Sequence, residues 1–328
     1  MQWLSCWHKV QPLDASPGGT TPRFFTASFY KFVGLPDHAA LQAPLQAVCL
    51  AHRVKGLVLL APEGINGGLS GAAADVQAVL DHLRQDPRLA DLVPRTSWAE
   101  HAPYHRMKVR LKKEIVTMGV PGVDPALMAG TYVAPQDWNA LIADPAVVLI
   151  DTRNEYEVAL GTFEGAINPH IDNFSQLPDW LSRSPAVQAM DGSKPKVAMF
   201  CTGGIRCEKS TALLRQMGFA EVFHLQGGIL EYLAQTPAEQ SRWQGECFVF
   251  DERVSVGHGL QPGGLGLCRN CRHTLREEDQ KSPWFELGVS CAHCHASTSE
   301  DRKRNARERQ RQWALKQWRA PLSLDDPA

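Results

Sequence analysis

Two short apolar runs constrain the fold of this chain most strongly: AVVLIDTR at 146–153 and KVAMFC at 196–201. Both are nearly continuous rather than alternating, which is typical of strands buried on both faces of a parallel sheet. Helical patterns and one further strand surround them: QDWNALIAD, QLPDWLSR, CEKSTALLRQMGF, EVFHL and LQGGILEYLAQ. Because strands alternate with helices, we expect a parallel α/β domain at 131–240 with helices on both faces of its sheet.

The N-terminal part has a different order of elements. FFTASFYKF suits a strand, HAALQAPLQAVCLAHR a helix whose first turn is marked by Pro44, and AAADVQAVLDHLRQD a second helix. Between the helices, GLVLLAPEGINGGLSG indicates two strands around a Gly/Asn turn, and HRMKVRLKKEIV is the expected last strand. This βαββαβ order predicts a ferredoxin-like domain at 23–130. Residues 1–22 are expected to form a flexible tail.

The chain is therefore predicted to be a multidomain protein of α+β and α/β parts, with a third segment at 241–328. Its 328 residues include nine cysteines and carry a formal net charge of −1. The N-terminus lacks the basic and apolar regions of a signal peptide, and no apolar run is long enough to span a membrane. Cysteines in such a chain indicate thiol chemistry or metal binding rather than disulfides, and we expect a cytoplasmic protein.

Cys201 is the strongest catalytic candidate. The segment CTGGIR at 201–206 connects a buried strand to a helix, at the strand end where ligands bind in parallel sheets. The helix start offers free N–H groups and a positive dipole end, which lower the pKa of a thiol. Gly203 and Gly204 allow the backbone to curl with its N–H groups inward, and Arg206 adds charge or braces the loop. The remaining loop residues are Thr202 and Ile205.

The two cysteines of this segment have other possible roles. An inert, buried Cys201 is disfavoured by the combination of strand, glycines, arginine and helix. Five residues separate Cys201 from Cys207, more than structural metal pairs usually have. A disulfide between the two would distort the loop. Cys207 is either a buried helical neighbour or a resolving thiol, and burial is favoured.

Four other cysteines have metal-ligand spacing. Two CxxC pairs, with 19 residues between them, are formed by Cys268 and Cys271 and by Cys291 and Cys294. Each pair can supply two thiolates to one tetrahedral ion, so the sequence predicts a structural zinc site resembling a zinc ribbon. A lost site or a redox site is the alternative.

Positive charge is concentrated outside the central domain, which holds 7 Lys and Arg against 13 Asp and Glu. Alternation along the expected strand at 105–116 places four cations on one face: Arg106, Lys108, Arg110 and Lys112. Residues 302–319 hold eight Lys or Arg and one acid, and the candidates there are Arg302, Lys303, Arg304 and Arg307. Both segments suit a phosphate backbone, although a solvated edge strand and a solvated helix are the alternatives.

The residues of the central domain resemble those of the rhodanese family. CTGGIR resembles its active-site loop, DTRNEYEVALGTFEGAINP its preceding segment, and LQGGILEYL its closing Gly-Gly motif. Tyrosine phosphatases have one more residue between Cys and Arg, so the tighter loop suits a bound sulfur atom. The resemblance implies that Cys201 is a persulfide-forming nucleophile. Asp151 and Arg153 either order the catalytic loop, meet the substrate or make local turn hydrogen bonds.

With PEGINGGLSG, CTGGIRCEKS and the CRNC…SCAHC tail included, the chain resembles the oxygen-dependent tRNA uridine hydroxylase family (TrhO). The resemblance implies 5-hydroxylation of the wobble uridine, position 34 of tRNA, with Cys201 essential and molecular oxygen as co-substrate. No flavin or haem motif is visible. A rhodanese sulfurtransferase is the alternative enzyme, and an RNA-binding zinc module with a vestigial catalytic domain is a non-enzymatic alternative.

Overall fold

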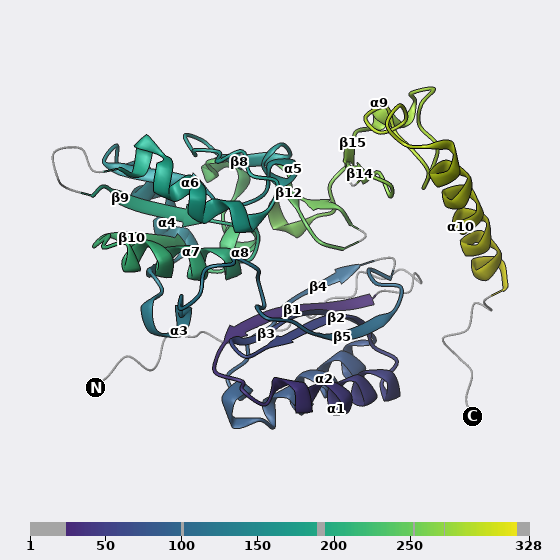
Figure 1. Ribbon diagram of the computed structural model, residues 1–328, viewed down its shortest axis with the longest axis horizontal. Helices are drawn as coiled ribbons and strands as arrows, with labels where there is room; N and C mark the ends of the chain where they lie inside the picture. Colours follow the sequence, from purple (N-terminus) through teal and green to yellow (C-terminus); the bar gives the residue numbers. More distant parts are fainter. Residues whose placement is uncertain (1–23, 100–101, 189–193, 252, 272, 320–328) are drawn as a thin grey trace.

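A computed structural model of the protein describes residues 24–99, 102–188, 194–251, 253–271 and 273–319 (Figure 1). The expected N-terminal tail, residues 1–22, lies outside this part of the chain. Within the described ranges, no helix combines the length and the apolar character that a membrane span needs.

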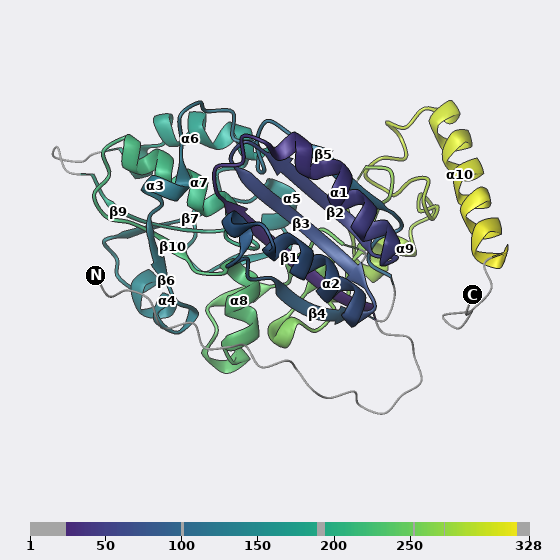
Figure 2. The same cartoon turned by 90° about the horizontal axis from the view of Figure 1, so that it is seen from below.

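The N-terminal half forms a five-stranded sheet in the order β4-β1-β3-β2-β5. Its strands are β1 (Phe24–Phe32), β2 (Lys55–Ala61), β3 (Gly64–Gly71), β4 (Arg95–Ala99) and β5 (Met107–Leu111). Helices α1 (His38–Ala51) and α2 (Ala73–Arg84) cover one face of the sheet (Figure 2). Leucine, valine and phenylalanine side chains from both layers fill the core between them. The first four strands have the ferredoxin-like arrangement that the sequence predicts.

The fourth strand of that arrangement differs from the expected one. It is β4, whereas the basic segment expected there forms a fifth strand, β5, which pairs in parallel with β2 at the opposite edge. The five residues of β4, RTSWA, are too short and too polar to give a clear strand pattern. The sheet therefore ends on a basic edge strand.

The turn between β2 and β3 also differs from the prediction. It lies at Pro62 and Glu63, and the glycines that follow lie within β3. A Cβ atom on Gly67 would lie 2.9 Å from the ring of Phe29, and one on Gly68 would lie 2.2 Å from the Tyr104 hydroxyl. These glycines are thus required by close packing across the sheet rather than by a turn.

Pro44 lies inside α1 rather than in its first turn. It is exposed, so the carbonyl group that loses its helical partner faces water. The helix can therefore continue through the proline without leaving a buried polar group unsatisfied.

The second half contains a parallel four-stranded sheet in the order β6-β10-β9-β7. Its strands are β6 (Thr131–Val133), β7 (Val147–Asp151), β9 (Lys196–Phe200) and β10 (Val222–Leu225). Helices α6 (Leu177–Arg183) and α7 (Ile205–Gln216) share one hydrophobic core, and α4 (Pro135–Ile142) and α8 (Gly228–Gln235) share the other. Along β9, Val197 and Met199 point into the first core and Ala198 and Phe200 into the second, as expected for a strand buried on both faces.

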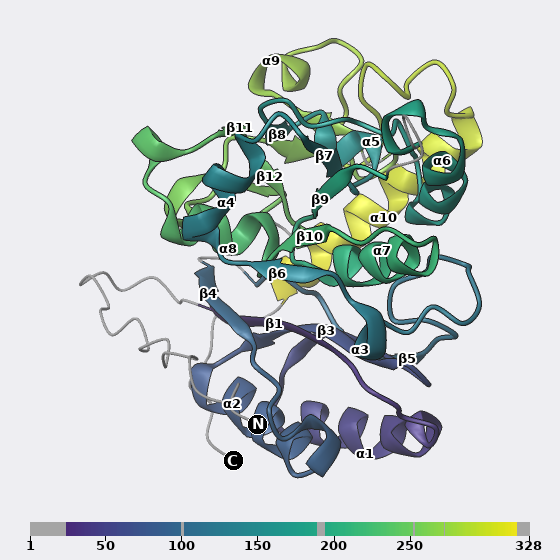
Figure 3. The same ribbon diagram turned by 90° about the vertical axis from the view of Figure 1, so that its left-hand side faces the viewer.

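Short elements complete the structure. They are α3 (Pro125–Met128), α5 (Glu155–Val158), β8 (Gly161–Phe163), β11 (Trp243–Gly245), β12 (Cys247–Phe248), β13 (Ser255–Val256), β14 (Gly266–Leu267), β15 (Thr274–Leu275) and α9 (Glu277–Gln280). The final helix, α10 (Glu300–Arg319), stands to the side of both sheets in Figures 1 and 2. The face of the N-terminal sheet that α1 and α2 leave uncovered is turned toward α7 and the parallel sheet (Figure 3).

Candidate active site and metal site

The cysteine loop, residues 201–206, follows the buried end of β9. Cys201 has no exposed surface, and its Sγ accepts a hydrogen bond of 3.1 Å from the Gly204 amide. Gly204 precedes the first residue of α7 and has a φ of +99°, a conformation that favours glycine. The sulfur therefore lies at the positive end of α7, within reach of an unpaired helix N–H group.

The start of α8 holds the loop from the other side. The amides of Ile229 and Leu230 donate to the carbonyl oxygens of Cys201 and Thr202, at 2.9 and 3.1 Å. A Cβ atom on Gly228 would lie only 2.5 Å from the Cys201 oxygen, so only glycine permits this approach. The Gly-Gly motif thus fixes the backbone of the catalytic loop.

The two cysteines of CTGGIRC have opposite acidities. Burial opposes ionisation of Cys201, but the hydrogen bond from the Cys207 thiol, the charge of Arg206 and the loop N–H groups together lower its pKa to about 5. Burial and the neighbouring Cys201 raise the pKa of Cys207 well above its usual value. Cys207 also has no exposed surface and lies 3.6 Å from the Thr152 hydroxyl. These opposite shifts favour ionisation of Cys201 over Cys207.

Arg206 braces the loop through an acidic partner. Its two terminal nitrogens donate to the Glu157 carboxylate at 2.6 and 2.7 Å, and one of them lies 3.3 Å from the Thr202 hydroxyl. Glu157 is fully buried, and although burial opposes its ionisation, Arg206 and Arg153 hold its pKa below the usual value. Ile205 packs against a small hydrophobic cluster of the N-terminal half, formed by Phe32, Ala61 and Ile115.

Asp151 and Arg153 form a second buried ion pair behind the loop. Arg153 donates to both carboxylate oxygens, at 2.9 and 2.6 Å, and neither side chain is exposed. Arg153 also donates to the carbonyl oxygens of Glu157 and Gly161. In this structure the pair orders the segment that presents Glu157 to Arg206.

The N-terminal sheet contacts the cysteine loop directly. Arg95 of β4 donates to the Gly203 carbonyl oxygen at 2.7 Å, and Tyr30 of β1 donates to the Glu208 carboxylate of α7 at 2.6 Å. A Cβ atom on Gly204 would lie 2.7 Å from the Tyr30 hydroxyl. Side chains from the two halves of the chain therefore enclose the catalytic loop together.

Lys209 joins the two halves a turn further along α7. The Lys209 side chain is 1% exposed and donates to both oxygens of Glu63, at 2.9 and 2.8 Å, to Glu114 and to the Val116 carbonyl oxygen. Glu63 belongs to the turn between β2 and β3, and Glu114 follows β5. The buried Lys209 ammonium group thus forms ion pairs with two carboxylates of the N-terminal half.

The basic stripe of Arg106, Lys108, Arg110 and Lys112 has no acidic side-chain partner among the described residues. One row of paired residues crosses the whole sheet. On β5 and β2, Lys108 lies opposite Leu57, and Leu57 lies opposite Gly68 on β3. Gly68 lies opposite Ser28 on β1, and Ser28 lies opposite Arg95 on β4. Residues directly opposite in a sheet share a face, so this row links the stripe to the arginine that touches the catalytic loop.

The cations that the sequence singles out on α10 have more acidic partners than those of the basic stripe. Lys303 is 5% exposed and pairs with Glu300, while Arg304 pairs with Asp301 and Arg307 with Glu286. Arg302 is exposed and has no acidic partner among the described residues. This helix therefore presents less free positive charge than its composition suggests.

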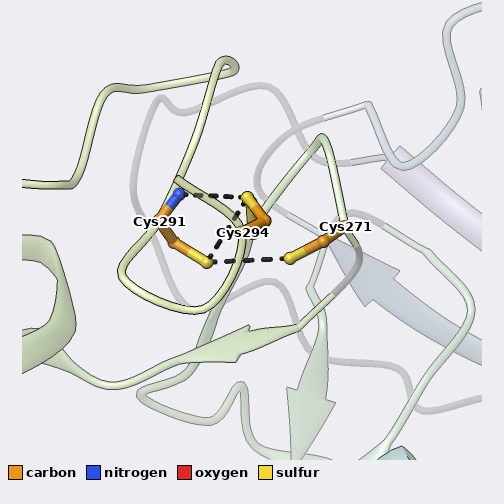
Figure 4. Close-up of side chains that lie close together, drawn as sticks. Cys271, Cys291 and Cys294 are labelled. Atoms are coloured by element: carbon orange, nitrogen blue, oxygen red, sulfur yellow. Dashed lines mark hydrogen bonds between the residues drawn. The ribbon is translucent and has the colours of Figure 1, made fainter. Parts of the chain in front are cut away.

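The four cysteines of the CxxC pairs converge at one point. Figure 4 shows three of them, Cys271, Cys291 and Cys294. Their Sγ atoms all lie within 4.8 Å of one another, and three pairs are separated by 3.6, 3.8 and 3.9 Å. Tetrahedral thiolates with metal–sulfur bonds of about 2.3 Å would be about 3.8 Å apart. The amide of Cys291 and the side chain of Asn270 also donate to Cys294 Sγ. The cluster fits one tetrahedral metal ion without rearrangement.

Several residues at the active site were not singled out by the sequence. Glu157 lies in DTRNEYEVALGTFEGAINP, the segment that resembles rhodanese sequences, and this resemblance is the signal that could have identified it. Tyr30, Arg95, Glu114 and Lys209 give no such signal, because only the packing of the two halves brings them to the loop.

Comparison with known proteins matches each half of the chain to a family. Residues 24–115 match the UPF0176 acylphosphatase-like domain, and residues 134–235 match the rhodanese-like domain. The second match contains the cysteine loop and both buried ion pairs.

Full-length relatives share the same name. The chain is 65% identical to the tRNA uridine(34) hydroxylase of Albidiferax ferrireducens, with 92% of this chain and 94% of the relative covered. It is 58% identical to that of Acaryochloris marina, over 92% of this chain and 96% of the relative. It is 54% identical to that of Sinorhizobium fredii, over 93% and 98% of the two chains.

Proposed function

This chain belongs to the tRNA uridine(34) hydroxylase family, and from that premise we propose that it hydroxylates C5 of the wobble uridine of tRNA, with Cys201 as the nucleophile. The observation that carries the assignment of Cys201 is its environment. The sulfur accepts the Gly204 N–H, and its pKa is lowered to about 5, so that it is a thiolate at neutral pH.

The thiolate can activate the uracil ring by addition. A bond forms between Cys201 Sγ and C6, and the electron pair of the C5–C6 double bond moves toward C5 and the C4 carbonyl. The ring then has nucleophilic character at C5, the position that is hydroxylated. Molecular oxygen is the co-substrate that we propose as the source of the hydroxyl oxygen. Its second oxygen atom leaves as water, with two electrons and two protons supplied by an external thiol reductant.

A persulfide on Cys201 is the competing chemistry, and it would make the protein a sulfurtransferase. The short loop between Cys201 and Arg206 supports this alternative, since the Gly204 N–H donates directly to the Cys201 sulfur and loop N–H groups of this kind stabilise sulfur anions. The two functions differ in their product: one leaves an additional oxygen atom on uridine and the other a sulfur atom.

The tRNA contact surface that we propose is part of the N-terminal sheet face opposite α1 and α2, between β5 and β4. The basic stripe lies at one edge of this face, and Arg95 lies at the other edge against the cysteine loop. Exposed Ser28 and Leu57 lie between them. A phosphate backbone bound by Lys108 and Arg110 would follow this row toward Cys201.

An aromatic side chain near the loop supports recognition of a base. Phe250 is 62% exposed, and the guanidinium of Arg206 lies 5.9 Å from the centre of its ring. Single-stranded RNA loops are typically recognised by stacking of unpaired bases on aromatic rings. An anticodon loop presents unpaired bases in this way.

Zinc is the metal that we assign to Cys268, Cys271, Cys291 and Cys294, in a structural role. Four thiolates leave no position for substrate, and zinc prefers this tetrahedral sulfur environment. The division into 23–130 for RNA binding, 131–240 for catalysis and 241–328 for metal binding remains our proposal. Because the proposed substrate is tRNA, we also propose a cytoplasmic location.

The test is the mass of tRNA nucleosides from a strain that lacks this protein and its functional equivalents. Expression of the wild-type chain should restore a uridine with one additional oxygen at position 34, and Cys201→Ser should not, although it should still bind tRNA. Full hydroxylation by Cys201→Ser would contradict the proposal. Restoration of a thio-uridine instead would support sulfur transfer.

A further inference from the structure

Glu208 is a buried carboxyl group beside the active site that the proposed chemistry does not yet use. It lies in the first turns of α7 and is 9% exposed. Its carboxylate accepts a 2.6 Å hydrogen bond from Tyr30, and the hydroxyl of Tyr132, on β6, is a further group that lowers its pKa. Among the described residues, no cation hydrogen-bonds to Glu208.

The other two buried carboxylates around the loop are held differently. Asp151 is bonded at both oxygens by Arg153, and Glu157 at both oxygens by Arg206. Such pairs are fixed as anions, because protonation would leave a buried guanidinium without its counter-charge. Glu208 accepts its hydrogen bond from the neutral hydroxyl group of Tyr30, so a proton can be added to it or removed without breaking an ion pair.

The electrostatic environment of Glu208 supports this distinction. Burial raises its pKa, the two tyrosine hydroxyls lower it in part, the Cys201 thiolate raises it and Arg95 lowers it, with a net increase above the usual value. A carboxyl group whose pKa moves toward neutrality is suited to general acid–base catalysis.

Tyr30 fixes the position of this carboxyl group relative to the sulfur. Its hydroxyl lies against Gly204, whose amide donates to Cys201 Sγ. Tyr30 is thus in contact with the catalytic loop on one side and with Glu208 on the other. Because Tyr30 comes from β1, the N-terminal sheet completes this part of the site.

We propose that Glu208 is a catalytic acid–base residue of the hydroxylation and that Tyr30 is its positioning residue. The proposal rests on the proposed function, with a covalent bond between Cys201 and C6 of uracil. After one oxygen atom of O2 is bound at C5 and the other has been reduced to water by the external thiol reductant, C5 carries a hydroxyl group and a hydrogen. Glu208 removes this hydrogen as a proton, the C5–C6 double bond re-forms, and the electron pair of the C6–S bond leaves with sulfur as the Cys201 thiolate.

The first variant is Glu208→Gln, which preserves size and an oxygen that can accept from Tyr30. Turnover of purified enzyme on tRNA should fall about 10²–10⁴-fold, the usual loss when a general base is removed. Product release by elimination is the step lost, so a covalent protein–tRNA adduct should accumulate on denaturing gels. The adduct should be absent when Cys201→Ser is combined with Glu208→Gln. Exposed Glu164→Gln is the matched control and should behave as wild type.

The second variant is Tyr30→Phe, which tests the positioning role. Loss of the hydroxyl removes a hydrogen bond that stabilises the carboxylate, so the pKa of Glu208 should rise. The acid limb of the kcat–pH profile should then move to higher pH while KM for tRNA changes less than twofold. A contact that only holds the two halves together would lower stability without moving this limb.

The outcomes separate the two proposals. Folded Glu208→Gln enzyme that turns over within about twofold of wild type, without an adduct, would overturn the role of Glu208 and leave the proposed function intact. If Glu208→Gln does not fold, an unchanged pH profile in Tyr30→Phe would overturn it instead. Hydroxylation by Cys201→Ser would contradict the proposed function itself.

Discussion

Arg206 and Glu157 form a doubly hydrogen-bonded ion pair beneath the cysteine loop, with nitrogen–oxygen distances of 2.6 and 2.7 Å. Both side chains are buried, and the pair connects the helix that follows Cys201 to the short helix α5. The arginine of the loop is therefore occupied within the protein, where it contributes charge to Cys201 and rigidity to the loop.

Glu157→Gln should destabilise the protein strongly. The amide has the same size but leaves the buried Arg206 without its counter-charge, and breaking such a pair typically costs about 3–5 kcal/mol. Urea denaturation measures the loss. Glu164→Gln, at an exposed position, is the control. A change below about 0.5 kcal/mol in Glu157→Gln would show that the ion pair does not support the fold.

Cys207→Ala should make Cys201 less acidic. Burial raises the pKa of Cys201, and the Cys207 thiol is the leading interaction that lowers it, so removal of this donor should raise the pKa above the wild-type value of about 5. The pH dependence of inactivation by iodoacetamide measures the change. Cys49→Ala, in the core of the N-terminal half, should leave the profile unchanged. If the pH dependence of inactivation is unaltered in Cys207→Ala, the low pKa of Cys201 is due to the backbone N–H groups and Arg206 alone.

Lys209→Met should weaken the contact between the two halves of the chain. The substitution leaves the Glu63 and Glu114 carboxylates facing one another, and loss of a buried partner costs about 3–5 kcal/mol. Alkylation of Cys201 should also become faster, because the N-terminal sheet encloses its loop. Lys113→Met, at an exposed neighbouring position, is the control, and equal alkylation rates in the two variants would contradict the prediction.

In Lys209→Met, this site should affect the unfolding free energy with a pH dependence opposite to that of the wild type. In the wild type, burial raises the pKa of Glu114. Lys209 and backbone amides lower this pKa by more than burial raises it, so the pKa lies below its usual value. Its stabilising contribution is present at neutral pH and is lost as the pH falls through the folded pKa. In Lys209→Met the two carboxylates repel, so protonation of one relieves the strain. The deficit in unfolding free energy should therefore be smaller at about pH 4 than at about pH 7.

Charge reversal of the basic stripe should weaken tRNA binding. The triple variant Arg106→Glu, Lys108→Glu and Arg110→Glu removes three cations that have no acidic side-chain partner among the described residues, and the salt dependence of the affinity should become shallower. Filter binding at several salt concentrations measures both effects. The matched control reverses Arg304 and Arg307, which pair with acids on or near α10, and it should weaken binding less. Unchanged binding by the triple variant would identify the stripe as a solvated edge.

Removal of metal should unfold the C-terminal cysteine segment and leave the structure around Cys201 unchanged. Native mass spectrometry should show one zinc ion per chain, and Cys271→Ser should lower this content. A strong chelator should increase hydrogen exchange around β14 and β15 but leave the β9–α7 loop protected. Full metal content in Cys271→Ser would contradict the four-thiolate site, whereas Cys49→Ala should retain the metal.

Much of this structure could be predicted from local patterns. The continuous apolar run of β9 requires a strand buried on both faces, and CTGGIR requires a tight turn into a helix, so the position of Cys201 follows from its neighbours in the chain. The two CxxC pairs likewise identify their metal site, because the spacing within each pair is a local property.

Local patterns were insufficient where packing overrides propensity. The strand β4 is short and polar, and it forms because β1 offers an unpaired edge to RTSWA. The glycines of β3 resemble a turn in sequence but lie in a strand, since Phe29 and Tyr104 pack where side chains would be. The cations of α10 have the expected composition, yet acidic neighbours compensate several of them.

The sequence by itself determined which residues are the candidate nucleophile, its loop and the candidate metal ligands, because each of these depends on residues a few positions apart. Only the tertiary structure decided what surrounds Cys201. Tyr30 and Arg95 reach the loop from strands more than 100 residues earlier in the chain, and Lys209 meets Glu63 and Glu114 across the same interface. Such contacts arise when two separately folded layers pack together, and no periodicity in the chain records which side chains will meet.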